Sequence, residues 1–227
     1  MSSPRSEFIS GLKAELPIAL SVIPFGMIYG VLALEAGLPE SATQAMSAII
    51  FAGSSQFIST QLFSQSAPGL IIVITVGVVN LRHLLYSASI AQYVQRLPVR
   101  WKLLLAYLLT DEAYAVSITR YNQPDDVRDK HWFFLSSGLM LWVIWQLSTA
   151  AGIFLGATIP ASWSLDFTLA LTFIALVVPA LKDRPSLGAA VTAGAIAVAT
   201  ASFPYRLGIL VAALVGILTG LWLEKRA

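Results

Sequence analysis

The sequence predicts an all-α polytopic membrane protein with about seven or eight hydrophobic helical segments, some of them broken or re-entrant. Of its 227 residues, 57% are hydrophobic and 11% are charged, and the mean hydropathy is +0.76. A soluble domain carries roughly 25% charged residues. Apolar runs follow one another from about Leu16 to the C-terminus, most of them near the ~20 residues that a spanning helix needs. Two of these runs contain ionisable residues, which are costly at membrane depth.

Eight runs can be delimited along the chain. They cover residues 16–35, 43–63, 68–91, 103–119, 132–156, 165–181, 187–203 and 206–223. The polar loop 120–130 divides them into two groups, and Gly26-x3-Gly30 in the first run is echoed by Gly152-x3-Gly156 in the fifth. Internal repeats are the usual construction of secondary transporters. We therefore expect one transmembrane domain over residues 1–227, with halves at 10–120 and 131–223.

Two membrane topologies remain open. If all eight runs cross and the N-terminus is inside, nine loop or tail lysines and arginines lie inside and four lie outside. If the second and fourth runs instead enter and return at the same side, twelve lie inside and Arg206 alone lies outside. The second version obeys the positive-inside rule better. Irregular backbone at membrane depth is allowed where it lines a cavity, and both runs have polar centres, at residues 53–56 and 110–112.

The third run sorts its polar residues onto one side. At 100° per residue, about half of the circumference carries Asn80, Arg82, His83, Tyr86, Ser87 and Ser89. The opposite side carries leucines, which is typical of a helix with one face on lipid and one on a polar interior. Snorkelling of Arg82 and His83 to an interface is the alternative.

The fourth run carries two carboxylates, Asp111 and Glu112, which point about 100° apart on a continuous helix. Tyr107, Thr110, Asp111, Tyr114 and Ser117 would form one polar stripe on that helix. We expect Asp111 to face a pathway and Glu112 to pair with a basic residue such as Arg82. Arg82, His83, Asp111, Glu112 and Tyr114 are the candidates for proton coupling or for a charge network.

The first and second runs supply candidate substrate contacts. Pro24 removes a backbone hydrogen bond and Gly26 permits unusual dihedrals, so we expect a kink or an unwound stretch there. Hydroxyl and amide side chains of the second run can hydrogen-bond a zwitterion. The candidate substrate-binding residues are Pro24, Phe25, Gly26, Tyr29, Gly30, Gly53, Ser54, Ser55, Gln56 and Asn80. The alternatives are helix packing through Gly26 and Gly30 and hydrogen bonding between helices.

Other classes of function find little support. The chain has no cysteine, and its two histidines, His83 and His131, fit no metal-binding spacing. No HExxH, GxSxG or nucleotide-binding loop occurs. We therefore expect no metal, no cofactor, no catalytic residue and no nucleic-acid partner. The glycines at 188, 216 and 220 in the last two runs are expected to pack helices together.

Four motifs in this order resemble the AzlC family of branched-chain amino acid permeases. They are Pro24-Phe-Gly-Met-Ile-Tyr-Gly30, Phe51-Ala-Gly-Ser-Ser-Gln-Phe57, Asn80-Leu-Arg-His83 with Tyr86, and Thr110-Asp-Glu-Ala-Tyr114. The resemblance covers nearly the whole chain and is strongest from about residue 10 to residue 120.

The resemblance implies a multi-pass permease subunit in the bacterial inner membrane. It would export valine, leucine, isoleucine and related neutral amino acids such as methionine, beside a separate small AzlD-type subunit and at the expense of the proton gradient. An exchange-only or channel-like conduit for small solutes, with purely structural charges, is the alternative function.

Overall fold

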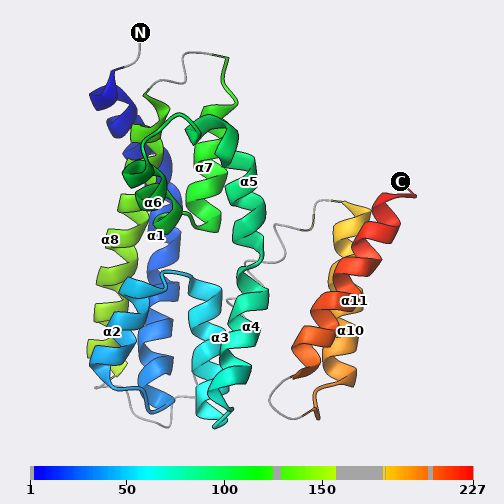
Figure 1. Ribbon diagram of the computed structural model, residues 1–227. Coiled ribbons are helices and arrows are strands. Elements are labelled where there is room, and N and C mark those ends of the chain that lie inside the picture. Colours follow the sequence, from blue (N-terminus) through cyan, green and yellow to red (C-terminus); the bar gives the residue numbers. More distant parts are fainter. Residues whose placement is uncertain (1–2, 125–128, 157–180, 182, 204–206, 227) are drawn as a thin grey trace. The chain divides into compact units, whose positions relative to one another are not determined.

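The computed structural model describes residues 3–124, 129–156, 181, 183–203 and 207–226. Within these ranges it contains helices and no strand, which confirms the predicted all-α class. The helices are α1 (Pro4–Glu35), α2 (Glu40–Ile49), α3 (Gly53–Ser64), α4 (Gly69–Asn80), α5 (Arg82–Val94), α6 (Val99–Tyr107), α7 (Asp111–Tyr121), α8 (Lys130–Gly156), α10 (Arg184–Ala199) and α11 (Leu207–Glu224) (Figure 1).

Four stretches of the described chain are long and apolar enough to cross a membrane, fewer than the seven or eight segments expected. They are Pro4–Glu35, Gly69–Val94, Lys130–Gly156 and Leu207–Glu224. The second and fourth predicted segments each split into two helices of 9 to 12 residues, which at 1.5 Å per residue reach only about halfway through a bilayer. The predicted segment 165–181 lies outside the described residues, apart from residue 181.

The chain divides into two compact units. One comprises residues 1–60 and 79–160, and the other comprises 61–78 and 161–227. In the second unit α10 begins at the cap Asp183, whose carboxylate accepts a hydrogen bond from the Ser186 amide at 2.7 Å, and this holds the pKa of Asp183 below its usual value. Helices α10 and α11 pack through small residues, since a Cβ added at Gly216 would lie 2.8 Å from the Ala193 Cβ. The expected packing role of these glycines is confirmed.

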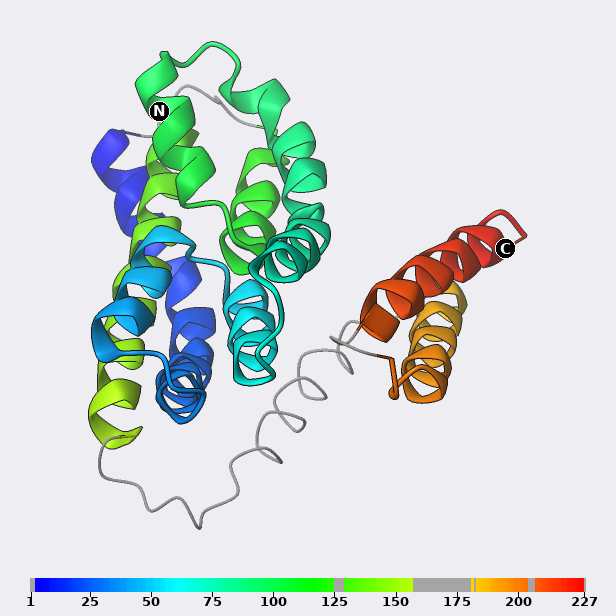
Figure 2. The ribbon, with the colours of Figure 1, turned by 60° about the horizontal axis from the view of Figure 1, so that its bottom comes forward.

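Helices α1 and α8 run side by side in the same direction and form the frame of the first unit (Figures 1 and 2). Helix α1 begins with Ser3 and Ser6 in a capping box and Pro4 at its first position, where a missing N–H costs nothing. It continues unbroken through Pro17 and Pro24. Gly30 and Gly152 let the two backbones meet, because added Cβ atoms would lie 2.6 Å from Thr149 O and 2.1 Å from Met27 O.

One end of this frame gathers the basic residues. The start of α1 meets the end of α7, where Arg120 Nε donates to Glu7 Oε2 at 2.9 Å. The start of α6 meets the start of α8, with the rings of Trp101 and Trp132 4.9 Å apart. We call this the basic end, and the lysines and arginines in or beside these helix ends are Arg5, Arg96, Arg100, Lys102, Arg120 and Lys130.

Helices α6 and α7 form a hairpin that enters from the basic end and returns to it (Figure 1). At its outer side, Tyr93 of α5 stacks on Tyr121 of α7 with centroids 4.7 Å apart. The buried Lys130 at the start of α8 donates to the Gln123 carbonyl at 2.8 Å. Residues 108–110 break the helix at the tip, and Thr110 caps α7 by accepting from the Ala113 amide.

Helix α2 and the first part of α3 form a second hairpin, whose tip points toward the first (Figure 1). Phe51, at the tip, has a φ of +44°, a left-handed conformation that a bulky residue adopts only under constraint. Its ring lies 6.1 Å from that of Tyr107 at the end of α6. Tyr107 Oη also donates to the Ala48 carbonyl. The two hairpin tips therefore meet inside the first unit, and both short-helix pairs have the geometry of the re-entrant alternative.

A cysteine placed at Pro98 tests this topology. In the re-entrant arrangement the exposed Pro98 lies at the basic end with the N-terminus, which the positive-inside rule places in the cytoplasm. We expect Pro98→Cys, in a chain without other cysteines, to react with a membrane-impermeant maleimide only from the cytoplasmic face. Glu40→Cys, at the exposed start of α2, is the matched control and is expected to react from the opposite face. Reaction of Pro98→Cys from outside only would rule the arrangement out.

Candidate functional site

An ion pair between Arg82 and Asp111 lies where three helices begin. Arg82 is the first residue of α5 and Asp111 the first of α7. Arg82 Nη1 donates to Asp111 Oδ2, and Nη2 donates to the hydroxyl of Ser54 in the first turn of α3 at 3.2 Å. The side chains of Arg82 and Asp111 keep 30% and 35% of their surface exposed, so the pair is reachable rather than sealed.

The expected pairing of Arg82 with Glu112 is wrong. Because the helix breaks at residues 108–110 and restarts at Asp111, the polar stripe expected on a continuous helix does not form. Asp111 turns toward α5, and Tyr107 belongs to the preceding helix, where it contacts Ala48 and accepts from Trp142 Nε1 at 2.6 Å. Glu112 lies within electrostatic reach of Asp111, Arg82 and Glu15.

The second sequence motif, at the start of α3, contributes further side chains to this site. Ser55 Oγ donates to Asn80 Oδ1 at 2.7 Å, at the end of α4. We call Ser54, Ser55, Asn80, Arg82 and Asp111 the ion-pair cluster. The sequence pointed to all five residues, and the structure brings them together from three separate motifs.

Aromatic rings of α5 and α7 line the side of the cluster toward the basic end. Tyr86 stacks on Tyr114 with centroids 4.5 Å apart, and Tyr114 Oη donates to Ser89 Oγ at 3.0 Å. His83 is edge-on to Tyr86, and its Nδ1 lies 3.3 Å from the Asn80 carbonyl. On the other side of α5, Leu84 and Leu85 are 65% and 71% exposed, as the predicted division between polar and lipid-facing sides requires.

Gln56 is buried and belongs to a different polar network. Its Nε2 donates to Ser47 Oγ at 2.9 Å, and its Oε1 accepts from Trp145 Nε1 at 3.1 Å. Gln44 Nε2 donates to Gln146 Oε1 at 2.8 Å beside them. These bonds tie α2 and α3 to α8. Sequence reasoning missed the α8 partners, although Gln146 is a lone amide in an apolar run and such a residue needs a partner.

The candidate residues of α1 lie away from the ion-pair cluster. Gly26 and Gly30 pack on α8, where a Cβ at Gly26 would lie 2.6 Å from the Ser148 Cβ. Tyr29 is buried, donates to the Thr43 carbonyl at 3.1 Å and packs on Phe57 and Trp145. Phe25 is half-buried and Pro24 is exposed. The helix is not unwound at Pro24, so the glycines serve the close helix packing that stood as the alternative.

Glu15 is a buried carboxyl that sequence reasoning overlooked. It has no exposed surface, one oxygen accepts from Ser137 Oγ, and Oε1 has no partner among the described residues. Its position directly before the apolar run starting at Leu16 made it look like a flanking charge. The capping signals at Ser3 and Pro4 show that the helix starts about three turns earlier, and that is the signal that places Glu15 inside it.

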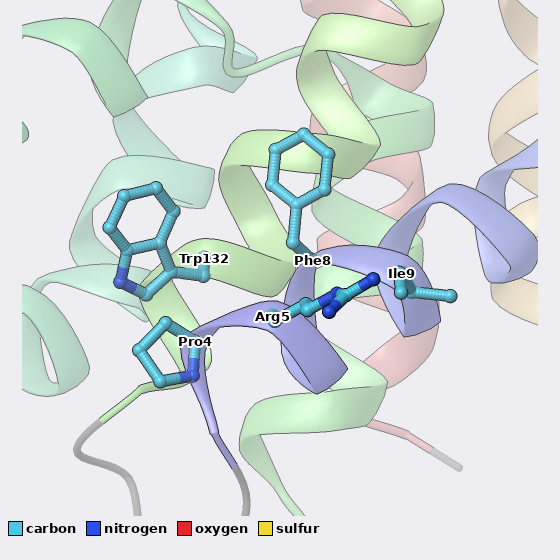
Figure 3. A pocket seen from close by; sticks show the side chains of 5 residues that line it. All are labelled: Pro4, Arg5, Phe8, Ile9 and Trp132. Carbon is cyan, nitrogen blue, oxygen red and sulfur yellow. The ribbon is translucent and has the colours of Figure 1, made fainter.

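Two grooves open at the basic end, and neither includes the ion-pair cluster. One, of about 330 Å³, is lined by Pro4, Arg5, Phe8 and Ile9 of α1 and Trp132 of α8 (Figure 3). The other, of about 460 Å³, lies among α1, α7 and α8 and is lined by Ala14, Ile18, Ala115, Val116, Thr119, Arg120, Gln123 and Phe133. Tryptophan and arginine at the ends of spanning helices are typical of the membrane interface.

The comparisons with known proteins match this chain to membrane proteins. A protein-family model described as AzlC protein matches residues 17–159. An uncharacterised membrane protein of Archaeoglobus fulgidus is 36% identical over 97% of both chains. The inner membrane protein YgaZ of Escherichia coli is 29% identical over 94% of this chain and 89% of its own.

A further relative carries a functional name. The branched-chain amino acid transport protein AzlC of Bacillus subtilis is 27% identical over 75% of this chain and 66% of its own. No solved structure matches the chain. The family match covers more than half of the residues, including every residue of the ion-pair cluster, and the chain therefore belongs to the AzlC family.

Proposed function

We propose that this protein is the large subunit of a proton-coupled exporter of branched-chain amino acids in the bacterial inner membrane. Its substrates are valine, leucine and isoleucine, with methionine as a related one, and it works beside a small AzlD-type membrane subunit. The name of the Bacillus subtilis relative supports the substrate class, and that of the Escherichia coli relative supports the location.

The observation that carries the proposal is the Arg82–Asp111 pair at the meeting of three helix starts. Charged side chains at membrane depth cost at least ~2.5 kcal/mol each even on lenient scales, and they persist mainly where they line a path for a polar solute. Hairpins that end inside the membrane supply such a place, because their broken tips offer free backbone groups and helix ends. Serine and asparagine side chains surround the pair without adding fixed charge.

In this proposal Asp111 carries the proton, and His83 of α5 is the alternative carrier or relay. Ser54, Ser55 and Asn80 contact the polar part of the substrate. The aliphatic part lies against the aromatic residues near the hairpins, among them Phe51 and Tyr86. Gly53, at the start of α3, lets that helix approach Trp145, whose ring would lie 3.1 Å from an added Cβ.

An exchange-only or channel-like conduit remains the second candidate, and one observation favours it. Asp111 is paired with Arg82, and a paired carboxylate can serve packing alone without ever exchanging a proton. Such a conduit would move amino acids down their own gradient, indifferent to pH.

Flux measurements in proteoliposomes separate the two candidates. We expect an imposed pH gradient to drive radiolabelled valine against its own gradient when the protein is reconstituted with the small subunit, and collapse of the gradient to stop the flux. Valine flux that ignores the pH gradient would favour the conduit. Absence of any valine, leucine or isoleucine flux in a well-folded sample containing the partner would overturn the proposal.

A further inference from the structure

The Arg82–Asp111 pair leaves part of its hydrogen-bonding capacity unused. One oxygen of Asp111 is bound by Arg82 Nη1, and Arg82 Nη2 is bound to Ser54. The remaining groups, Arg82 Nε and Asp111 Oδ1, are covered and have no hydrogen-bond partner among the described residues. A buried polar group without a partner is rare and costs about 1–3 kcal/mol, more when it is charged. The pair thus holds one unused cationic donor and one unused anionic acceptor side by side.

These two unused groups match the two charged groups of an α-amino acid. The free guanidinium N–H can donate a charge-assisted hydrogen bond to a carboxylate. A carboxylate oxygen accepts from an ammonium, which has three donors and no acceptor. A keto acid would leave Asp111 unsatisfied, and a simple amine would leave Arg82 unsatisfied. A zwitterion satisfies both and leaves no net charge in the membrane.

Neutral side chains hold the pair in place, and the Tyr86 hydroxyl of α5 also interacts with the Asp111 carboxylate. The Ser54 hydroxyl accepts from Nη2, and Ser55 fixes Asn80 at the end of α4. Asp111 and Glu112 lie in the first turn of α7, where the helix dipole favours negative charge. Arg82 and Asp111 come from different helices, so a ligand between them bridges α5 to the hairpin of α6 and α7.

We propose that Arg82 and Asp111 are the two anchors of the substrate, with Arg82 on the α-carboxylate and Asp111 on the α-ammonium. In the empty protein the two side chains pair with each other, and the amino acid inserts between them. This inference rests on the proposed function and refines it, because it assigns to Asp111 the substrate amine as well as the proton.

Because the substrate ammonium and the proton would both bind Asp111, the exchange of one for the other has a simple physical basis. A protonated Asp111 is neutral and has lost its attraction for an ammonium, so proton and amino acid exclude each other. The titratable and charged groups around Asp111 are Arg82, His83 and Tyr86 of α5 and Glu112 of α7, with Glu15 of α1 beyond Glu112. Among the described carboxylates near Arg82, Asp111 forms the salt bridge with it.

Binding of leucine and two analogues to the purified protein with its small subunit tests the assignment. Ketoisocaproate lacks the ammonium of leucine, and isoamylamine lacks the carboxylate. We expect the unaltered protein to bind leucine about 10- to 100-fold more tightly than either analogue, the range that one hydrogen bond to a charged group gives. Asp111→Asn is expected to remove most of the preference over ketoisocaproate while keeping the preference over isoamylamine. Glu112→Gln, the neighbouring carboxylate, is the matched control and is expected to keep both preferences.

A double variant guards against a simple folding defect. Asp111→Asn alone leaves Arg82 without its counter-charge, whereas Arg82→Gln with Asp111→Asn removes both charges together and leaves none unpaired. We expect this double variant to elute as a folded protein and to lose both preferences. If leucine binds to the unaltered protein and the double variant keeps both preferences, the anchors lie elsewhere and the proposed function stands. If leucine does not bind to or move through the unaltered protein, the proposed function itself fails.

Discussion

Replacing Asp111 by Asn is expected to abolish valine movement driven by a pH gradient while valine–valine exchange continues at saturating valine. Asparagine has nearly the same shape and can still accept a hydrogen bond from an ammonium, but it carries no exchangeable proton. The side chain would therefore still admit substrate, with weakened affinity, and could no longer alternate between substrate and proton. Proteoliposomes preloaded with unlabelled valine report exchange, and empty ones under a pH gradient report coupled flux.

Two comparisons make this result informative. Glu112→Gln removes a carboxylate one residue away, and it is expected to retain gradient-driven flux if Asp111 is the carrier. His83→Asn tests the alternative carrier in the same assay. Equal loss of exchange and of gradient-driven flux in Asp111→Asn, in a sample that still elutes as a folded protein, would contradict the assignment of the proton to Asp111.

Gly152→Ala is expected to cause the largest loss of stability of any single methyl addition in the first unit. The new Cβ would lie 2.1 Å from Met27 O and 2.7 Å from Met27 Cα, and both are backbone atoms that no rotamer change can move. Overpacking costs typically ~1–3 kcal/mol and occasionally more. Helices α1 and α8 would have to separate along a seam that also contains Gly26 and Gly30. Thermal unfolding in detergent, followed by loss of the monodisperse elution peak, measures the effect.

Gly77→Ala in α4 is the matched control for this substitution. No described atom lies within 4 Å of a Cβ added there, and alanine favours a helix over glycine by ~1 kcal/mol. We expect this variant to unfold at the same temperature as the unaltered protein or slightly above it. A Gly152→Ala protein as stable as the Gly77→Ala protein would show that the two helix backbones are not in contact.

The sequence was sufficient to predict the helical class and the existence of breaks in the second and fourth apolar runs, since polar residues in their centres are costly within a continuous lipid-facing helix. It was not sufficient to place the first break. That break falls on apolar residues 50–52, because the strained Phe51 is held there by Tyr107 of a distant helix. A contact between residues 56 positions apart cannot be recognised from the local composition or from the periodicity of apolar residues.

For the candidate site, too, the residues could be recognised from the local sequence, whereas their partners depend on contacts between distant segments. The five residues of the ion-pair cluster were recognisable from charge and polarity within apolar runs. The partner of Arg82 was predicted one residue too far along the chain. The prediction treated the fourth run as a continuous helix, whereas a new helix begins after the cap at Thr110, which changes the direction in which the following side chains point. The contribution of Pro24 was overstated, because a long helix packed along its length on α8 tolerates the proline without unwinding.

The two kinds of contact in the first unit differ in how they can be undone. Backbone lies against backbone where α1 crosses α8 at Gly30 and Gly152, so no solvent molecule can substitute for either side. The hairpins are held largely by side-chain bonds, such as Tyr107 to the Ala48 carbonyl and Gln44 to Gln146. Water can replace such bonds one at a time at little enthalpic cost. Water can therefore enter at the hairpin tips without unfolding any helix. The contacts between α1 and α8, by contrast, cannot be replaced by water one at a time.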